Sequence, residues 1–236
     1  MTPDEFKAAF RSRTLAYAPG FPDASEPVAV RVGDAAHNRA GHTLLVVLAN
    51  LLARAHSDVV FVGSPPRELL CPDVFGERDL EAATTGRMQA INPFGQFRWQ
   101  RSEPERALLM LGVGSSARVE VPLGFCGWIA SVGADAIAVD RQGAPYGAVL
   151  AAILGANVAF HRALGRREVP SGVSSAWDHF KPTMLQGPDV VEPLDAGRVL
   201  QVGAGGVGAA LDYFVALTSG IRPAWTIVDG DDVDVK

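Results

Sequence analysis

The sequence predicts an α/β fold in which helices flank a mostly parallel sheet, and three observations indicate it. The 236 residues are 48% hydrophobic and 20% charged, a composition typical of folded globular proteins. Apolar, valine-rich strands alternate with amphipathic helices, as in parallel sheets that are covered on both faces. Residues 28–63 and residues 199–229 each have the order strand, helix, strand, which is the order of a parallel βαβ unit.

Residues 1–27 are expected to form a short N-terminal helix and a lead-in to the sheet. Thr2 stands where an N-cap would, Pro3 takes the first helical position, and Glu5 can close a capping box. The acidic start does not resemble a signal peptide, and the longest uncharged stretches, such as Pro145 to Phe160, fall short of the roughly 20 residues of a membrane span and are rich in Ala and Gly. We therefore expect a cytoplasmic protein without a membrane-spanning segment.

Residues 28–168 are expected to form the first domain, which opens with a βαβ unit. Strands at 28–33 and 58–63 flank a helix at 40–55. The apolar residues of this helix recur at intervals of three and four, so they share one face and are expected to pack on the sheet. These residues are Leu44, Val47, Leu48, Leu51 and Leu52.

The rest of the first domain is expected to hold three further strands and a long helix. The strands are predicted at 107–112, 128–132 and 136–140. The helix, at about 145–164, has a face of small residues that allows close packing. That face consists of Ala148, Ala151, Ala152, Gly155, Ala156 and Ala159. Residues 64–106, with several prolines and weak periodicity, are expected to be a long excursion with little regular structure.

A proline-rich segment at 169–197 is expected to be a linker, and residues 198–236 to open a second domain. Strands at 199–203 and 225–229 flank a helix at 208–219. This order repeats that of residues 28–63. An internal duplication is one interpretation of the repeat, and the general likeness of any two βαβ units is the other.

A glycine-rich segment joins the first strand of the second domain to its helix. It fits the pattern G-x-G-x-x-G, and an acid follows 21 residues after its last glycine, at the end of the next strand. Glycines permit a tight turn and a close approach of phosphate to the main chain, and the start of a helix attracts phosphate. The acid can accept hydrogen bonds from ribose hydroxyls. The pattern predicts nucleotide binding by Gly203, Ala204, Gly205, Gly206, Val207, Gly208 and Asp229.

Residues 198–235 resemble the ThiF/MoeB/HesA family, to which the ubiquitin-activating enzymes belong. The Gly205–Gly206 doublet carries the resemblance, together with Asp229 and Asp231 in an Asp-x-Asp-x-Val frame. The resemblance implies ATP-dependent adenylation, assisted by Mg²⁺, in which the C-terminal carboxylate of a β-grasp protein attacks the α-phosphate and pyrophosphate leaves. It also implies that the glycines hold phosphates, that Asp229 holds the ribose and that Asp231 lies beside it.

The later functional residues of that family have no counterpart in this sequence. In the family an Asn-Leu-Asn-Arg-like segment follows the acid pair, and a lysine, a magnesium-binding aspartate and often a thioester-forming cysteine come further on. This sequence ends at Lys236. One βαβ unit cannot bury a doubly wound sheet by itself. We therefore expect the second domain to be incomplete, and to be completed by further sequence of a longer protein, by a separate chain or in a homodimer.

The first domain is expected to be an inactive copy of the same fold, because larger members of the family pair an active half with an inactive one. Residues 33–41 stand where the glycine segment would, but they lack its spaced glycines, and Asp34 would place a carboxylate near phosphates. The predicted fold is thus Rossmann-like, an inactive copy followed by an incomplete nucleotide-binding copy. Residues 10–15 faintly resemble a family segment whose arginine reaches ATP. Arg13 is therefore a candidate phosphate contact, and a solvated charge at a helix end is the alternative.

Charge and cysteine content argue against several other functions. The formal charge of −5 gives no attraction for nucleic acid, so the arginines and aromatics of 87–106 indicate a protein-contact loop or a surface loop pinned by aromatics. His37 and His42 are five apart and do not share a helix face, so no metal site is predicted. Cys126 is expected in the core and Cys71 in a loop, and no nucleophile is assigned.

We therefore expect part of an activating enzyme for a ubiquitin-like or sulfur-carrier β-grasp protein. Bacterial relatives of this kind serve sulfur-carrier chemistry or antiviral defence, and the sequence does not choose between them. Two alternatives stay open. One is an NAD-dependent oxidoreductase in which Asp229 accepts the ribose hydroxyls of NAD, and the other is an inactive scaffold of the same fold that binds a partner protein.

Overall fold

The structure is a computed structural model, and it divides the chain into two compact units, Met1–Gly187 (unit 1) and Pro188–Lys236 (unit 2). The two units are described separately. The residues that the structure describes are 2, 4–6, 8–9, 26–73, 76–115, 117–140, 145–168, 171–178, 186–187, 197–202, 212–213, 215–216 and 224–229.

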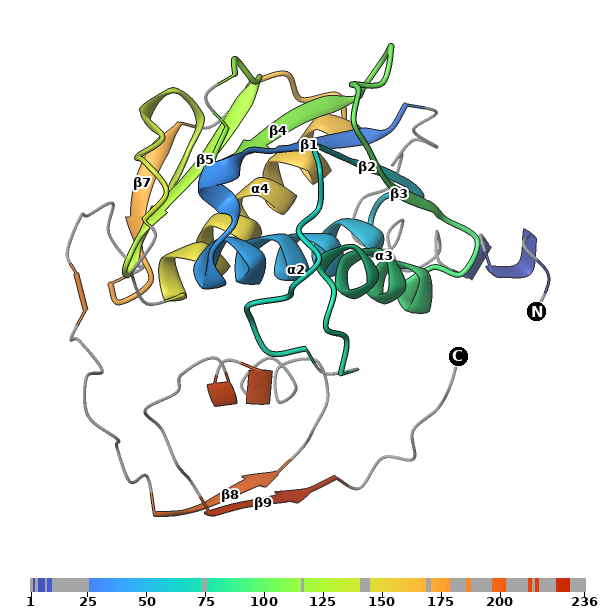
Figure 1. The fold of residues 1–236 in the computed structure, drawn as a ribbon. Helices are drawn as coiled ribbons and strands as arrows, with labels where there is room; N and C mark the ends of the chain where they lie inside the picture. The colour runs from blue at the N-terminus through green and yellow to red at the C-terminus, as the bar shows by residue number, and fades with distance from the viewer. Residues whose placement is uncertain are drawn as a thin grey trace. The chain divides into compact units, whose positions relative to one another are not determined.

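Unit 1 contains a seven-stranded sheet in the order β3-β2-β1-β4-β5-β6-β7 (Figure 1). Strands β1 to β5 pair in parallel, and β6 and β7 are added antiparallel. The predicted α/β class with a mostly parallel sheet is confirmed. The strands are β1 Val28–Val32, β2 Asp58–Val62, β3 Gln96–Gln100, β4 Leu109–Val113, β5 Val121–Cys126, β6 Ile129–Val132 and β7 Gly172–Ser175.

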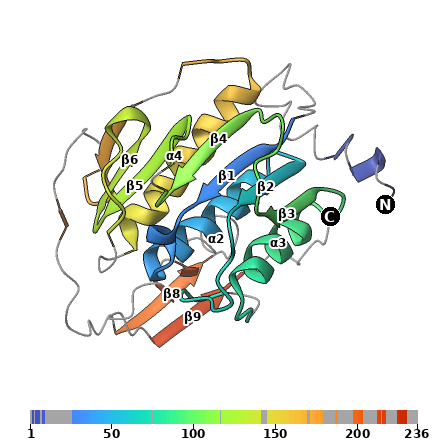
Figure 2. The ribbon, with the colours of Figure 1, turned by 45° about the horizontal axis from the view of Figure 1, so that its top comes forward.

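Helices α2 (Arg39–Ala53), α3 (Leu80–Ile91) and α4 (Tyr146–Ala163) lie on one face of this sheet (Figures 1 and 2). α2 and α4 confirm two predicted helices. Short 3-10 turns, η1 (Asp34–Ala36) and η2 (Gly133–Asp135), follow β1 and β6. None of the helices within the described ranges is long and apolar enough to cross a membrane.

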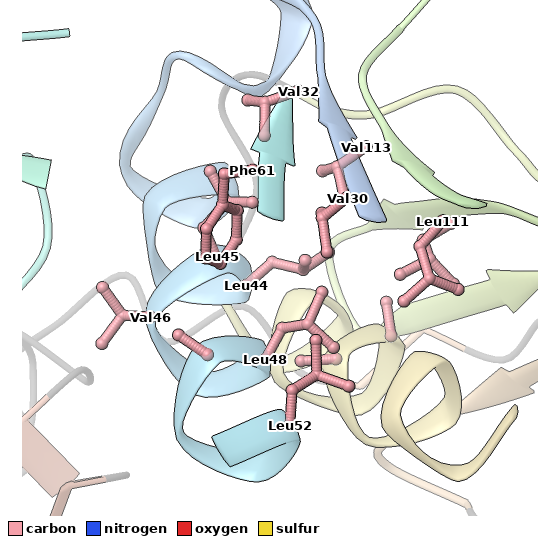
Figure 3. Packing of buried hydrophobic residues seen from close by; sticks show 14 of the residues in the cluster. Val30, Val32, Leu44, Leu45, Val46, Leu48, Leu52, Phe61, Leu111 and Val113 are labelled. Carbon is pink, nitrogen blue, oxygen red and sulfur yellow. The ribbon is translucent and has the colours of Figure 1, made fainter. Parts of the chain in front are cut away.

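The core of unit 1 lies between α2 and the centre of the sheet (Figure 3). Val30, Phe61 and Leu111, from three neighbouring strands, face Leu44 and Leu48 of α2, and all five are fully buried. Burying a large apolar side chain contributes about 1.5–3 kcal/mol. Leu44, Leu48 and Leu52 of the predicted apolar face are confirmed as buried, whereas Val47 and Leu51 are only partly buried.

A small apolar cluster lies on the opposite face of the sheet. Ala29, Val60 and Val62 are buried on that face, with Ala107 and Met110 packed against them. The second face therefore has an apolar layer, although the helices lie on the first.

The prediction of little regular structure at 64–106 is wrong, because the segment contains α3 and β3. α3 begins at Asp79, whose carboxylate accepts the N–H of Ala82 at 2.9 Å. An N-cap of this kind starts a helix whether or not its apolar residues are periodic. In β3, Trp99 stacks on Phe61 with ring centroids 5.0 Å apart, and its Nε1 donates to Thr84 Oγ1 at 3.0 Å. The aromatics thus anchor an edge strand, where a surface loop was one of the interpretations.

The predicted strand at 136–140 is also wrong. These residues are held by isolated hydrogen bonds, from Asp140 N–H to the Phe125 carbonyl at 2.9 Å and from Ile137 N–H to Ser131 Oγ at 2.8 Å. The pairing strand is β5, which contains Pro122 and a glycine. Both residue types are uncommon inside strands, so the sequence pattern does not indicate it.

The N-terminal segment and the predicted linker at 169–197 can also be compared with the structure. The predicted N-terminal capping box is confirmed, because the Thr2 N–H donates to the Glu5 carboxylate at 2.7 Å and the Glu5 N–H donates to Thr2 Oγ1 at 3.3 Å. Within 169–197, the range expected to be a linker, residues 172–175 form β7 at the edge of the sheet. The compact part of unit 1 extends to Gly187.

Unit 2 contains a two-stranded parallel sheet, β8 (Arg198–Val202) and β9 (Ala224–Val228). Residues 212–213 and 215–216, between the strands, are helical. The predicted order strand, helix, strand is therefore confirmed in the described part of this unit.

Candidate nucleotide-binding site

The carboxyl edge of the β8–β9 pair brings the two ends of the predicted motif together. β8 and β9 are parallel, and Val202 lies opposite Val228. The glycine segment starts at the next residue after Val202, and Asp229 is the next residue after Val228. In α/β sheets, ligands bind outside the carboxyl ends of parallel strands. The register therefore places an exposed carboxylate at the edge where the glycine segment begins.

Hydrogen bonds of Gln201, which lies one residue before the end of β8, connect the two strands to the helical residues between them. Gln201 is 6% exposed. Its Oε1 accepts a hydrogen bond from Trp225 Nε1 at 3.0 Å, and its Nε2 donates to Asp212 at 3.4 Å. One side chain thus joins β8, β9 and the crossover between them, which stabilises the register that positions the edge.

The opposite face of the β8–β9 pair is apolar and exposed. Side chains alternate along a strand, so Leu200 and Val202 share a face with Thr226 and Val228. The exposed fractions of Leu200, Val202 and Val228 are 65%, 80% and 51%. Parallel sheets are normally buried on both faces, so this face is expected to be covered in the complete protein.

Of the predicted site residues, the structure describes Asp229. Eight others lie outside the described residues. They are Arg13, Gly203, Ala204, Gly205, Gly206, Val207, Gly208 and Asp231.

The corresponding edge of unit 1 is filled by its own main chain. η1 follows β1 directly, and the Gly33 N–H donates to the Val113 carbonyl at the end of β4 at 3.0 Å. A Cβ at Gly33 would overlap the carbonyl oxygen of Gly114, and a Cβ at Gly114 would overlap the N–H of Ala36. Gly114 also has a φ of +60°, which favours glycine. The main chain that follows β1 and the main chain that follows β4 are therefore in direct contact at this edge.

The start of α2 is also satisfied by its own residues. Asn38 Oδ1 accepts the N–H of Gly41 at 3.0 Å, and Asn38 Nδ2 donates to the Ala35 carbonyl at 2.7 Å. N–H groups at a helix start bind anions when they are free. At α2 the N-cap side chain occupies one of these groups, whereas a phosphate site needs it open.

His42 tethers the β2–α3 connection to α2. It is fully buried, and its Nδ1 accepts the N–H of Leu70 at 3.1 Å. Burial, and secondly the nearby His37, lower the pKa of His42 to about 4. A neutral ring whose Nδ1 accepts a hydrogen bond carries its proton on Nε2, so Nε2 has no lone pair for a metal. His42 therefore has a structural role.

Cys71 lies in a loop, as expected, but it is buried against the core, whereas Cys126, which was expected in the core, is only partly buried. The Cys126 thiol lies 3.7 Å from the Asp140 carboxylate. Burial, followed by the charge of Asp140, raises the pKa of this thiol. A raised pKa opposes formation of the thiolate, so Cys126 is not an activated nucleophile.

Comparison with known proteins places unit 1 in a family. Residues 27–174 match the family described as the BilD N-terminal domain, and the match runs from the start of β1 into β7. The crystal structure of Escherichia coli MccB with succinimide shares 8% sequence identity, over 71% of each chain, with a TM-score of 0.46. The comparison with curated proteins gave no match. Because the matched residues are more than half of the sequence, the chain belongs to the BilD N-terminal domain family.

Proposed function

We propose that the complete protein activates the C-terminal carboxylate of a ubiquitin-like or sulfur-carrier β-grasp protein by ATP-dependent adenylation. The carboxylate oxygen forms a bond to the α-phosphorus, and the bond from that phosphorus to the bridging oxygen breaks to release pyrophosphate. The parallel register of β8 and β9 carries the proposal. It sets the start of the Gly203–Gly208 segment and the Asp229 carboxylate at one edge.

The residues at this edge fit a nucleoside triphosphate. Asp229 is exposed beside the end of β8, and a carboxylate is a strong acceptor for ribose hydroxyls. The glycines of the 203–208 segment would hold the phosphates through main-chain N–H groups, and Asp231 would lie beside the ribose acid. Mg²⁺, when bound with ATP, would neutralise charge on the phosphates.

Unit 1 is proposed to be the half that binds no nucleotide. The contact between Gly33 and Gly114 at the edge of β1 and β4 supports this role. The family name, which describes an N-terminal domain, supports unit 1 as the first domain of a larger protein. The exposed apolar face of β8–β9 supports a second domain that needs more polypeptide, from a longer chain, a separate chain or a second copy. Arg13 remains the proposed phosphate contact from the first unit.

Exchange of radiolabelled pyrophosphate into ATP tests the proposal. The complete protein is mixed with a candidate β-grasp protein, and exchange is expected only when both are present. The matched control is the same partner with an amidated C-terminus, which has no carboxylate to adenylate and should support no exchange. An NAD-dependent oxidoreductase and an inactive scaffold would both give no exchange. Calorimetry that detects NAD uptake without ATP uptake would favour the oxidoreductase and contradict the proposal.

A further inference from the structure

Gln201 is a buried polar residue within a strand, a place where apolar residues are the rule. It lies in β8 and is 6% exposed, so its amide is largely removed from water. A buried amide costs free energy when its donor or its acceptor is unpaired. Here Oε1 accepts the Nε1–H of Trp225 at 3.0 Å, and Nε2 donates to the Asp212 carboxylate at 3.4 Å. The two bonds therefore hold the side chain in one orientation.

The bond to Asp212 joins two residues that lie on either side of the glycine segment in the sequence. Gln201 comes two residues before Gly203, and Asp212 comes four residues after Gly208. The bond therefore closes a loop that contains residues 202–211. Holding the two ends of a loop together reduces the number of conformations that the loop can adopt. The donor atom of the Gln201 amide is thus linked to the segment that is proposed to hold phosphates.

The bond to Trp225 links the acceptor atom of the same amide to the strand that precedes Asp229. Trp225 lies in β9 opposite Val199 of β8, and Asp229 follows the end of β9. Because the donor and the acceptor are different atoms, a substitution can remove one bond and keep the other. The phosphate side and the ribose side of the proposed site can therefore be tested separately.

We propose that Gln201 is a positioning residue of the nucleotide site, and that its bond to Asp212 keeps the glycine segment in the conformation that binds the phosphates of ATP. This inference rests on the proposed function. Gln201 acts through the two ends of the segment and does not itself contact the nucleotide. Neither residue belongs to the G-x-G-x-x-G pattern or to the acid pair, so the motif alone does not predict their contact.

Exchanging the amide and the carboxylate between positions 201 and 212 tests the proposal on the complete protein. Gln201→Glu keeps an acceptor for Trp225 but places two carboxylates next to each other, which repel. ATP affinity, measured by isothermal titration calorimetry, should fall about 10-fold. Adding Asp212→Asn restores the bond with the donor on residue 212, and ATP affinity should return to within about 2-fold of that of the unsubstituted protein.

Adenosine separates the positioning of phosphates from a general structural role. It has the ribose but no phosphate, so its affinity should change less than about 2-fold in Gln201→Glu. The Trp225 indole N–H keeps its acceptor and should stay protected from hydrogen exchange. Asp212→Ala removes the same bond without burying a charge, and it should give the same selective loss of ATP affinity even where Gln201→Glu fails to fold. Equal losses for ATP and adenosine in Asp212→Ala would reject the proposal.

The matched control is Gln186→Glu in unit 1, where another glutamine makes two hydrogen bonds of the same kind. Its Oε1 accepts the Trp128 N–H at 3.0 Å, and its Nε2 donates to the Cys126 carbonyl at 3.1 Å. This variant should leave ATP affinity unchanged. ATP binding by the unsubstituted protein without any loss in Gln201→Glu and Asp212→Ala would reject the inference and leave the proposed function standing. No ATP binding by the unsubstituted protein would overturn both.

Discussion

The two units contain the same strand, helix, strand order but differ at the residues that follow their strands. In unit 1 the chain after β1 turns into η1 and packs on Gly114 at the end of β4. In unit 2 the chain after β8 enters the glycine segment, and the neighbouring strand ends at an exposed acid, Asp229. β2 is followed instead by Gly63, which has no side chain to offer a ribose. The two units therefore share a strand order, and they differ in a few residues at the carboxyl edge of their strands.

The units also differ in how their strands are covered. Residues such as Val30 and Leu111 of unit 1 are fully buried, whereas Leu200 and Val202 of unit 2 are largely exposed. Both pairs lie in apolar parallel strands, and the difference comes from what packs on them. One βαβ unit does not bury both faces of its strands by itself, which supports the proposal that further polypeptide completes the second domain.

The largest expected effect is on nucleotide binding. Gly205→Val should abolish ATP binding by the complete protein, because a branched side chain would fill the space that a phosphate needs next to the main chain. Unit 1 should stay folded. Isothermal titration calorimetry measures the affinity, and an affinity within a factor of two of the unsubstituted protein would contradict the assignment.

The matched control is the same change in unit 1. Gly114→Val would overlap Ala36 and force a branched residue into a positive φ, so it should lower the free energy of unfolding of unit 1 by about 1–3 kcal/mol or more. It should leave ATP affinity unchanged wherever the protein stays folded. Equal loss of ATP binding in both variants would break the comparison between the two edges.

The second expected effect is on stability, and it compares a buried side chain of unit 1 with an exposed side chain of unit 2. Leu48 of α2 is fully buried, so Leu48→Ala should cost about 2–5 kcal/mol of unfolding free energy. Val202 is 80% exposed, so Val202→Ala should change it by less than about 0.5 kcal/mol in the chain of 236 residues. Urea unfolding followed by circular dichroism measures both. A cost for Val202→Ala that appears only in the complete protein would show that its face becomes covered there.

The sequence predicts best those helices and strands whose hydrophobic pattern reflects directly which of their faces are buried. The apolar face of α2 and the small-residue face of α4 each repeat with the helical period, because the sheet selects one face of a helix. The strands Val28–Val32 and Asp58–Val62 are apolar except for Arg31 and Asp58, and their apolar residues are buried.

The errors arise where the environment comes from distant residues. α3 has weak periodicity because it packs on both α2 and β3, and its start depends on one N-cap at Asp79. β5 carries Pro122 and Gly124, which local propensity assigns to a turn. For the candidate site, the glycine motif predicts which strands bear it, and the parallel register of β8 and β9 confirms their pairing. The filled edge of unit 1 depends on β4, more than 70 residues after Gly33, and no local pattern reports that contact.

A third prediction uses pH, since unit 1 holds buried histidines and residues 188–236 contain no histidine. Burial lowers the pKa of both His42 and His56 to about 4, from an ordinary value of 6.5. Above pH 6.5 both histidines are mostly neutral in the folded chain and in the unfolded chain. Between pH 6.5 and pH 4 the unfolded chain binds protons that the folded chain does not, so stability falls as the pH falls.

Each of the two histidines should therefore cost unit 1 about 2 kcal/mol of unfolding free energy between pH 7 and pH 5. His42→Asn can keep an acceptor for the Leu70 N–H but does not titrate, so its stability should depend less steeply on pH. Urea titrations at several pH values measure the slopes. Parallel slopes for the two proteins would show that His42 is not a source of the dependence.

The smallest effect concerns the acid that distinguishes the two edges. Asp229→Asn keeps one acceptor oxygen but removes the charge, and charge-assisted hydrogen bonds are the stronger kind, so ATP affinity should fall about 10-fold, or about 1.4 kcal/mol. The reciprocal variant is Ser64→Asp, which supplies an acid near the end of β2 in unit 1. It should create no ATP binding there, because the segment after β1 has no spaced glycines and packs directly on Gly114. New ATP binding in a Ser64→Asp, Gly205→Val double variant would show that an acid alone makes the edge a site. Its absence, together with the loss in Asp229→Asn, would show that the acid acts only where the main chain leaves the edge open.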